Sequence, residues 1–203
     1  MVVDQLRAWR IVLASQSPRR LQLLKQLGLP FDVIPSTFEE NLDKSLFPTP
    51  DLYVMENAKQ KALEVFNRLK NQGEHPDLVI GCDTVVSYRD KILEKPKDEQ
   101  DAVNMLSMLS NNEHQVFSGV ALCVRSNPYV HVFSEKTAVQ FRALDPQTIR
   151  DYIATGEPMD KAGSYGLQGQ AKAFVTAVHG CSNNVIGFPV DRFCKEVERF
   201  LTS

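Results

Sequence analysis

Apolar residues recur along the chain with two different periods, and these periods predict alternating strands and helices. Short apolar runs bounded by turn residues predict strands at 10–14, 31–35 and 77–88. A spacing of three and four residues predicts helices at 18–27 and from about residue 50 onward. The longer helix carries apolar side chains on one face, namely Met55, Ala58, Ala62, Val65 and Leu69.

The second half of the chain continues this alternation and adds two long β segments. Asp98 and Asp145 are typical helix-capping residues, and Gly156 ends the second of these helices. Apolar segments at 115–124 and 130–142 predict neighbouring strands, and a strand at 172–178 and a helix after residue 189 complete the chain. Adjacent long strands favour a mixed sheet. We therefore expect an α/β protein, a mixed β-sheet with flanking helices, forming one domain over residues 1–203 with two lobes around a cleft.

Two arginines stand at the start of the first long helix, where acidic residues are normally favoured. Ser17 suits the N-cap and Pro18 suits the first helical position, and this end of a helix carries partial positive charge. Arg19 and Arg20 are explained if a polyanion binds there, because the free backbone N–H groups already attract anions and Ser15 adds a hydroxyl. Two solvated arginines on a surface helix are the alternative.

One carboxylate interrupts an apolar strand. Asp83 lies in the segment GCDTVV, where a carboxylate is costly unless it has a partner or a metal. Its position predicts a general base or a metal ligand at a strand end, and a turn-forming Asp that simply ends the strand is the alternative. Lys95 follows after a short hairpin, so both residues are expected at one edge of the same cleft unless Lys95 is an ordinary surface residue.

Further charged residues fit the same chemistry. The acidic pair Glu39 and Glu40 lies in a polar loop, and with Asp83 it offers the oxygen ligands that magnesium prefers. Lys59 and Lys61 lie on the long helix. Taken alone, both pairs are also explained as solvated surface charge.

A glycine-rich loop follows residue 156, with the sequence GEPMDKAGSYGLQG. Glycines recur there every third residue, and such a loop can approach a ligand closely. Lys161, Tyr165 and Gln168 stand between them and offer an ammonium, an aromatic ring and an amide to read a base. A plain flexible loop is the alternative.

Composition narrows the function classes. A net charge of −2 gives no overall attraction to nucleic acid or to anionic membranes, and no apolar run approaches the ~18 residues of a membrane span. The scattered cysteines indicate reduced thiols in a cytosolic protein. The four histidines show no metal-ligand spacing and are expected at the surface or in loops. Motifs of P-loop, Rossmann, zinc-protease and serine-hydrolase enzymes are absent from the sequence.

Six motifs occur in a specific order: LASQSPRR, FEE, KQKA, GCDTVV, ILEKP and GEPMDKAGSYGLQG. On these motifs, the sequence resembles the Maf-like nucleoside triphosphate pyrophosphatases from about residue 11 to the final helix. It looks most like the dTTP/UTP branch, which carries S-P-R-R, G-x-D-T and Y-G-[IL]-Q-G. Arg19 and Gln168 separate it from the branch acting on methylated guanine nucleotides. One departure is 170–172, which reads Gln-Ala-Lys where the family commonly has Leu-Gly-Gly.

The resemblance implies hydrolysis of dTTP and UTP to the monophosphate and pyrophosphate, in a nucleotide-binding cleft and as a house-cleaning activity on the nucleotide pool. It implies Asp83 as proton acceptor, Glu40 and Asp83 as ligands of Mg²⁺ or Mn²⁺, and a cytoplasmic homodimer without nucleic-acid or membrane partners. Around the base it implies Arg19, Thr84 and Gln168, and around the phosphates Ser15, Arg20, Lys61, Lys95 and Lys161. The alternative is a nucleotide-binding regulator, active in division control, with little turnover.

Overall fold

The computed structural model describes residues 2–202, and these divide into two compact units. Unit 1 consists of residues 2–83, 118–135 and 187–202, and unit 2 consists of residues 84–117 and 136–186. The expected two lobes correspond to these units. Within the described residues, no helix combines the length and the hydropathy that crossing a bilayer requires.

The strands form one seven-stranded mixed sheet, as the two adjacent β segments predicted. Its order is β2 (Asp32–Val33), β1 (Ile11–Leu13), β3 (Leu78–Tyr88), β5 (Glu113–Val124), β6 (His131–Phe141) and β7 (Val175–His179), with β4 (Lys91–Leu93) paired to β3. β1 runs parallel to β2 and to β3, whereas β3 with β4 and β6 with β7 are antiparallel. The chain passes from one unit to the other within β3, β5 and β6.

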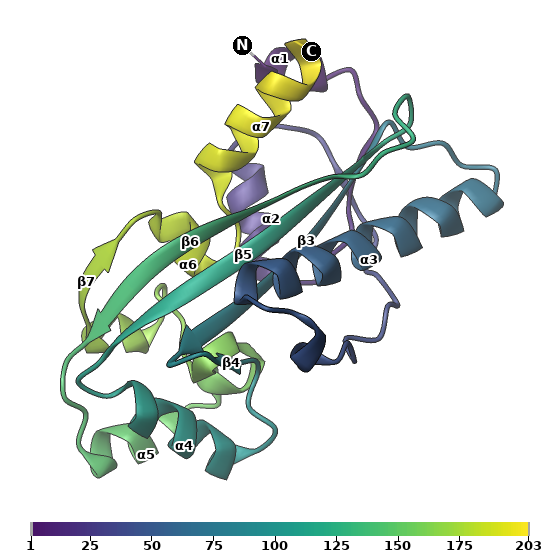
Figure 1. The fold of residues 1–203 in the computed structure, drawn as a ribbon. Coiled ribbons are helices and arrows are strands. Elements are labelled where there is room, and N and C mark those ends of the chain that lie inside the picture. The colour runs from purple at the N-terminus through teal and green to yellow at the C-terminus, as the bar shows by residue number, and fades with distance from the viewer. Residues whose placement is uncertain (1, 203) are drawn as a thin grey trace. The chain divides into compact units, whose positions relative to one another are not determined.

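The helical elements of unit 1 include the two helices predicted in the first half of the chain and the one predicted after residue 189. They are α1 (Val2–Leu6), α2 (Pro18–Lys25), the 3₁₀ turn η1 (Lys44–Leu46), α3 (Pro50–Asn71) and α7 (Val190–Thr202), and α1 lies beside α7 (Figure 1). Ser17 caps α2 and accepts a hydrogen bond from the Arg20 amide, with Pro18 as the first helical residue. The short helix α1 has no counterpart among the sequence predictions.

Figure 1 shows helix α3 running along the strands of the sheet, and it packs on β3 and β5 with almost no space between the backbones at two glycines. A Cβ atom on Gly81 would lie 2.1 Å from the Ala58 carbonyl oxygen, and one on Gly119 would lie 2.4 Å from the Val54 carbonyl oxygen. Glycine is therefore required at both strand positions. The predicted apolar face of α3 is buried in the same cluster through Ala58, Ala62, Val65 and Leu69.

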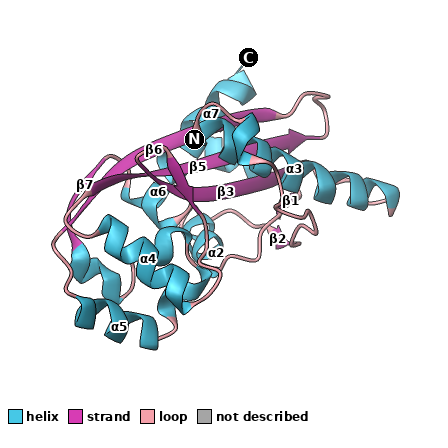
Figure 2. Cartoon of the chain, turned by 60° about the horizontal axis from the view of Figure 1, so that its bottom comes forward, coloured by secondary structure: helices cyan, strands magenta, loops and turns pink. Residues whose placement is uncertain are grey.

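Unit 2 has its own apolar core. Its helical elements are α4 (Glu99–Leu109), α5 (Pro146–Ala154), α6 (Ser182–Ile186) and the 3₁₀ turns η2 (Glu157–Asp160), η3 (Ala162–Ser164) and η4 (Gln170–Phe174). Figures 1 and 2 show α4 and α5 side by side. Their apolar faces pack together with Phe141, Tyr165 and Phe174. Asp98 and Asp145 cap α4 and α5 as predicted.

Two local predictions are wrong. The strand expected at 172–178 begins only at Val175, because the chain up to Phe174 forms the turn η4. His114 is not a surface residue, since it lies in β5 with 2% of its surface exposed. All four cysteines are free thiols, and Cys82 and Cys123 are buried.

Candidate functional site

The start of α2 forms the first part of the candidate site, in unit 1. Ser15 lies two residues after the end of β1 and is buried. Its hydroxyl oxygen accepts hydrogen bonds from the Ser17 amide at 3.2 Å and from Nη1 of Arg20 at 3.3 Å. Nε of Arg20 donates to the carbonyl oxygen of Gly187 at 3.0 Å. These bonds hold the Arg20 guanidinium at the helix N-terminus, where anions are favoured.

Lys61 is the centre of the second part of the site. Its Nζ lies 3.0 Å from Oδ1 of Asp83 and 3.0 Å from Oε2 of Glu40. Only 7% of Lys61 and 6% of Asp83 are exposed, whereas the Glu40 side chain is 45% exposed. Burying a charge is costly without an opposite charge, and this pair supplies one. The two carboxylates therefore converge on one buried ammonium.

Strand alternation explains why Asp83 meets Lys61. Residues 81 and 83 of β3 point to the same face of the sheet, and Gly81 is in contact with α3. Lys61 lies on α3 one turn beyond Ala58, which touches Gly81. The prediction that Asp83 stands at a strand end is wrong, because β3 continues to Tyr88. Asp83 instead projects from the middle of the strand toward the helix.

The two glutamates at positions 39 and 40 make different contacts. Glu40 reaches Lys61, whereas Oε2 of Glu39 accepts a hydrogen bond from Nδ2 of Asn41 at 3.4 Å. Lys59 likewise differs from Lys61, since its ammonium lies 3.9 Å from Glu56 on the same helix at a partly exposed position. For Glu39 and Lys59, the surface explanation fits the structure better.

The loop that carries Glu40 is attached to α3 by residues that the sequence predictions did not include. Oε2 of Glu64 accepts hydrogen bonds from the Ser36 hydroxyl and the Thr37 amide, both at 2.9 Å. Nη2 of Arg68 donates to the Pro35 carbonyl oxygen at 2.8 Å, and its Nε donates to Glu64 at 2.7 Å. Burial acts to raise the pKa of Glu64, but these hydrogen bonds outweigh it and lower the pKa to about 2.

Unit 2 holds the glycine-rich loop through Lys161 and Glu157. Nζ of Lys161 donates to the Glu157 carbonyl oxygen at 2.5 Å and forms an ion pair with Asp160 at 2.7 Å. A Cβ on Gly166 would lie 2.6 Å from Cε of Lys161, so glycine allows the lysine stem to cross the loop at this position.

Gln168 stands in the tight turn of this loop. The Gly169 amide donates to the Gly166 carbonyl oxygen at 3.2 Å, and the Gln168 side chain between them is exposed. The Glu157 carboxylate accepts hydrogen bonds from the Tyr152 hydroxyl at 3.0 Å and from the Gln170 amide at 3.1 Å. The amide of Gln168 is thus presented to solvent on an anchored turn.

Tyr165 does not have the role expected from the sequence. Its side chain is 5% exposed, and its hydroxyl lies 2.7 Å from Nε2 of His114. Its ring packs edge-on against His114 and Phe141. Burial lowers the pKa of His114 to about 4, so that this histidine is neutral at pH 7. Tyr165 therefore anchors the loop in the core of unit 2 and offers no free ring to a base.

The predicted site residues are divided between the two units. Unit 1 contains Ser15, Arg19, Arg20, Glu40, Lys61 and Asp83, and unit 2 contains Thr84, Lys95, Lys161 and Gln168. Within unit 1, contacts join Ser15 to Arg20 and join Lys61 to both carboxylates. Within unit 2, Lys95 is exposed and Thr84 is half-buried directly after Asp83 in β3.

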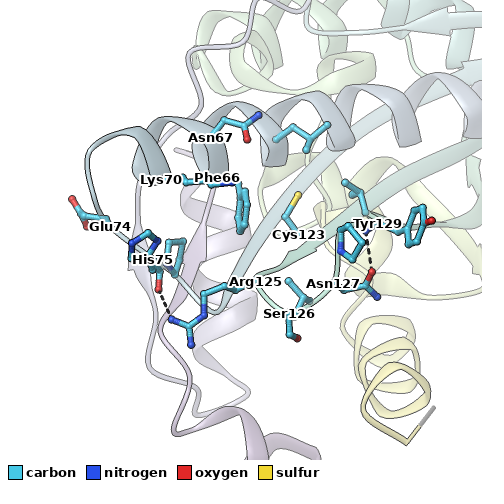
Figure 3. Close-up of a pocket in the computed structure, with 15 residues that line it drawn as sticks. Phe66, Asn67, Lys70, Glu74, His75, Cys123, Arg125, Ser126, Asn127 and Tyr129 are labelled. Atoms are coloured by element: carbon cyan, nitrogen blue, oxygen red, sulfur yellow. Dashed lines mark hydrogen bonds between the residues drawn. The ribbon is translucent and has the colours of Figure 1, made fainter.

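A pocket of about 430 Å³ lies elsewhere in unit 1, between the second half of α3 and the end of β5 with its following loop (Figure 3). None of the predicted site residues lines it. Among its charged residues, Arg125 pairs with Asp77 at 2.7 Å and Glu74 pairs with Arg10. Two charged residues of the pocket are thus already paired with other residues of unit 1.

The carboxylates of Glu40 and Asp83 are the donors available to a metal ion. Because both lie 3.0 Å from the same ammonium, they are close enough to share one cation. Among residues 2–202 there is no cluster of three or more histidine, cysteine or acidic side chains that could enclose a metal. Mg²⁺ commonly uses one or two carboxylates together with water and substrate phosphates. The residues present fit a metal of this kind.

Comparisons with known proteins assign the family. The family model described as "Maf-like protein" matches residues 10–200. A human protein named "Probable bifunctional dTTP/UTP pyrophosphatase/methyltransferase protein" is 50% identical over 203 residues, which cover 97% of this chain and 33% of that protein. The chain thus spans about a third of this relative.

Bacterial relatives match over nearly their full length. A "dTTP/UTP pyrophosphatase" of Clostridium perfringens is 43% identical over 191 residues, covering 94% of this chain and 97% of the relative. One of Agathobacter rectalis, with the same name, is 44% identical over 201 residues with the same coverage. The chain belongs to the Maf-like protein family.

Proposed function

We propose that this chain is a nucleoside triphosphate pyrophosphatase that hydrolyses dTTP and UTP to the monophosphate and pyrophosphate. Modified pyrimidine nucleotides are candidate substrates as well, and removal of such nucleotides from the cellular pool is the proposed role. Family membership and the names of relatives at 43–50% identity support this activity.

The observation that carries the proposal is the buried Lys61 between Asp83 and Glu40. Hydrolysis at a triphosphate needs a base for water and cations against the charge of the phosphates. Asp83 is held in a fixed position by an ammonium 3.0 Å away. This arrangement supplies both requirements within one hydrogen-bonded group.

In the proposed reaction, Asp83 orients a water molecule and accepts its proton as the oxygen attacks the α-phosphorus. The bond from that phosphorus to the oxygen bridging the α- and β-phosphates breaks, and pyrophosphate leaves with the bonding electrons. Lys61 and Arg20 stabilise the negative charge, and Lys95 and Lys161 are proposed as further phosphate-binding residues. Ser15 adds a hydroxyl that already fixes Arg20 at 3.3 Å.

A divalent cation completes the proposed site. Glu40 and Asp83 would hold Mg²⁺ or Mn²⁺ together with the phosphate oxygens. When bound, such an ion neutralises phosphate charge and acts as a Lewis acid. Glu40 is well suited to this role because its side chain is 45% exposed and its carboxylate can turn from Lys61 toward a ligand.

The base is proposed to be recognised by Arg19, Thr84 and Gln168. An amide donates and accepts hydrogen bonds at the same time, which matches the O4 and N3–H edge of uracil or thymine. The exposed amide of Gln168, on its anchored turn, supports this assignment. A glutamate at this position accepts hydrogen bonds only.

The proposals for assembly and location have separate grounds: the family resemblance supports a homodimer, the scattered cysteines support the cytoplasm, and the net charge of −2 argues against nucleic-acid and membrane partners. We propose a cytoplasmic homodimer of a single 1–203 domain, with nucleotides as ligands and without nucleic-acid or membrane partners. A nucleotide-binding regulator with little turnover is the second candidate. The complete set of polar motif residues in the sequence favours the enzyme.

The test is product identity. The protein is incubated with dTTP, UTP, CTP, ATP and GTP separately, with Mg²⁺ or Mn²⁺, in water enriched in ¹⁸O. We expect pyrophosphate from dTTP and UTP, with the label in the monophosphate and none in pyrophosphate. Orthophosphate with a nucleoside diphosphate would assign a different reaction. Tight nucleotide binding in a titration without product would favour the regulator.

A further inference from the structure

We propose that Glu64 and Arg68 are positioning residues, which fix the loop 35–40 on α3 and thereby place the Glu40 carboxylate for metal and phosphate binding. The inference rests on the proposed function, because it assigns a task to Glu40. It concerns two residues outside the six motifs that carry the family resemblance.

The loop is held on both sides of Ser36. Glu64 accepts hydrogen bonds from the Ser36 hydroxyl and the Thr37 amide at 2.9 Å, while Arg68 donates to the Pro35 carbonyl oxygen at 2.8 Å. The Phe38 amide donates to the Ser36 hydroxyl oxygen at 3.1 Å, which closes a local turn. Three consecutive residues are thus fixed by one side-chain pair.

Helix periodicity connects this anchor with the proposed catalytic group. Lys61, Glu64 and Arg68 are spaced by three and four residues, so their side chains share one face of α3. Lys61 binds Glu40 on this face at 3.0 Å. The chain is therefore attached to the same helix face at residues 35–37 and again at residue 40.

The charges explain why the anchor is strong. A carboxylate offers two oxygens with several acceptor positions, and Glu64 uses them for Arg68, Ser36 and Thr37 together. Charge-assisted bonds of this kind are stronger than neutral ones. The pKa of Glu64, about 2, keeps this carboxylate ionised at the pH of any ordinary assay.

The first experiment measures the loop directly, without activity. Hydrogen–deuterium exchange of the amides at 36–40 is compared between the parent protein, Glu64→Ala and Glu56→Ala. Glu56 is a matched control, since it is a glutamate on the same helix whose ion-pair partner, Lys59, is also on that helix. We expect exchange at least ~10-fold faster in Glu64→Ala and unchanged in Glu56→Ala. Unchanged exchange in Glu64→Ala would overturn the proposal.

The second experiment measures how the loop acts on the reaction. In Glu64→Ala, we expect the Mg²⁺ concentration that gives half-maximal dTTP hydrolysis to rise ~10-fold, with a smaller fall in kcat at saturating Mg²⁺. Ser36→Ala, a change in the loop itself, removes one bond to Glu64 and should give a smaller rise of ~2–3-fold. This variant keeps the test valid if Glu64→Ala folds poorly.

A double-mutant comparison separates positioning from general destabilisation. If Glu64 acts through Glu40, Glu64→Ala should change the Mg²⁺ dependence little when Glu40→Gln is already present. If Glu64→Ala raises the half-maximal Mg²⁺ concentration by the same ~10-fold in the parent protein and in Glu40→Gln, the proposal is overturned. Absence of pyrophosphate release by the parent protein would instead contradict the proposed function, and the exchange experiment would still test the anchor.

Discussion

Two loops of the protein are each held by one glutamate, but the partners differ. In unit 1, Glu64 forms an ion pair with Arg68 and accepts hydrogen bonds from the loop before Glu40. In unit 2, Glu157 binds the Tyr152 hydroxyl and the Gln170 amide next to the Gln168 turn. Both carboxylates accept bonds from a hydroxyl and a backbone amide, and the first anchor differs by its additional ion pair with Arg68, which itself donates to the Pro35 carbonyl oxygen.

This difference matches the tasks that we propose for the residues beside each anchor, Glu40 in unit 1 and Gln168 in unit 2. Metal and phosphate binding beside the first anchor needs fixed charges, and Lys61 and Asp83 there are paired and buried. Base recognition beside the second anchor needs a complementary surface and one amide. Glycines allow the close contacts of this loop, and the buried ring of Tyr165 anchors it. Substitutions in the two regions should therefore change different properties of the reaction.

The largest effect is expected at Asp83. Asp83→Asn keeps the size of the side chain but removes the proton acceptor, so we expect kcat to fall at least ~100-fold, the scale of losing a general base. The fall should be the same for dTTP, UTP and CTP, because the base does not contact Asp83 in this assignment. Steady-state kinetics with each nucleotide measure it, and nucleotide binding in a titration should be largely retained.

Near-normal turnover by folded Asp83→Asn would contradict the assignment of the base. A loss confined to one nucleotide would contradict the division of tasks between the two regions. Circular dichroism is the control for folding, since Lys61 loses an ionic partner in this variant but keeps Glu40.

The residues of the charged cluster were named by the family resemblance, whereas their contacts were not predicted. The apolar strand indicated that Asp83 needs a partner, but from the sequence it was expected beside Lys95 and was not paired with Lys61. The Glu64 anchor was not predictable in the same way. Glu64 and Arg68 are spaced like an ordinary surface pair on a helix, and their contacts lie 27 and 33 residues away in sequence.

The second prediction concerns the effect of pH on the free energy of unfolding, through the buried contact of His114 with Tyr165 in unit 2. The pKa of His114 is lowered to about 4 by burial, from an ordinary value near 6.5. Between these values the unfolded chain binds the proton and the folded chain does not, so the free energy of unfolding should fall as pH falls from ~6.5 to ~4. The contribution of this residue to that loss should approach ~3 kcal/mol.

Urea denaturation at several pH values between 7.5 and 4.5 measures this effect. His114→Gln retains a group that can bond the Tyr165 hydroxyl but does not titrate, so its stability should depend less on pH over this window. An identical pH dependence in both proteins would contradict the role of His114. Glu64 contributes little over this window, because its pKa is about 2 in the folded protein and its ordinary value of 4.5 lies at the lower end of the window.

The packing roles of His114 and Tyr165 also could not be predicted from sequence patterns. A tyrosine between glycines is compatible with a ring that contacts ligand and with a ring that anchors the loop, and only the packing against Phe141 and His114 separates these roles. The boundary of β7 was missed for a similar reason, since 172–174 directly precedes the apolar strand residues and was included with them but forms a 3₁₀ turn. Local periodicity does not determine such tertiary contacts.

The smallest and most selective effect is expected at Gln168. Gln168→Glu removes the donor of the amide, so that a bound uracil or thymine finds an acceptor opposite its own acceptor O4. We expect kcat/KM for UTP and dTTP to fall by the equivalent of ~1–3 kcal/mol, the cost of a polar group left badly paired once the base covers it. ATP and GTP turnover should not rise in compensation, because the backbone of the anchored turn limits the size of the base. The measurement is kcat/KM for five nucleotides with both proteins.

If the substitution lowers kcat/KM for all five nucleotides by one factor, Gln168 acts on the phosphates or on the loop structure, and the contrast between a charge-bearing and a base-reading region is wrong. If only the pyrimidine nucleotides change while Asp83→Asn lowers all of them alike, the two regions have the separate tasks that their anchors indicate.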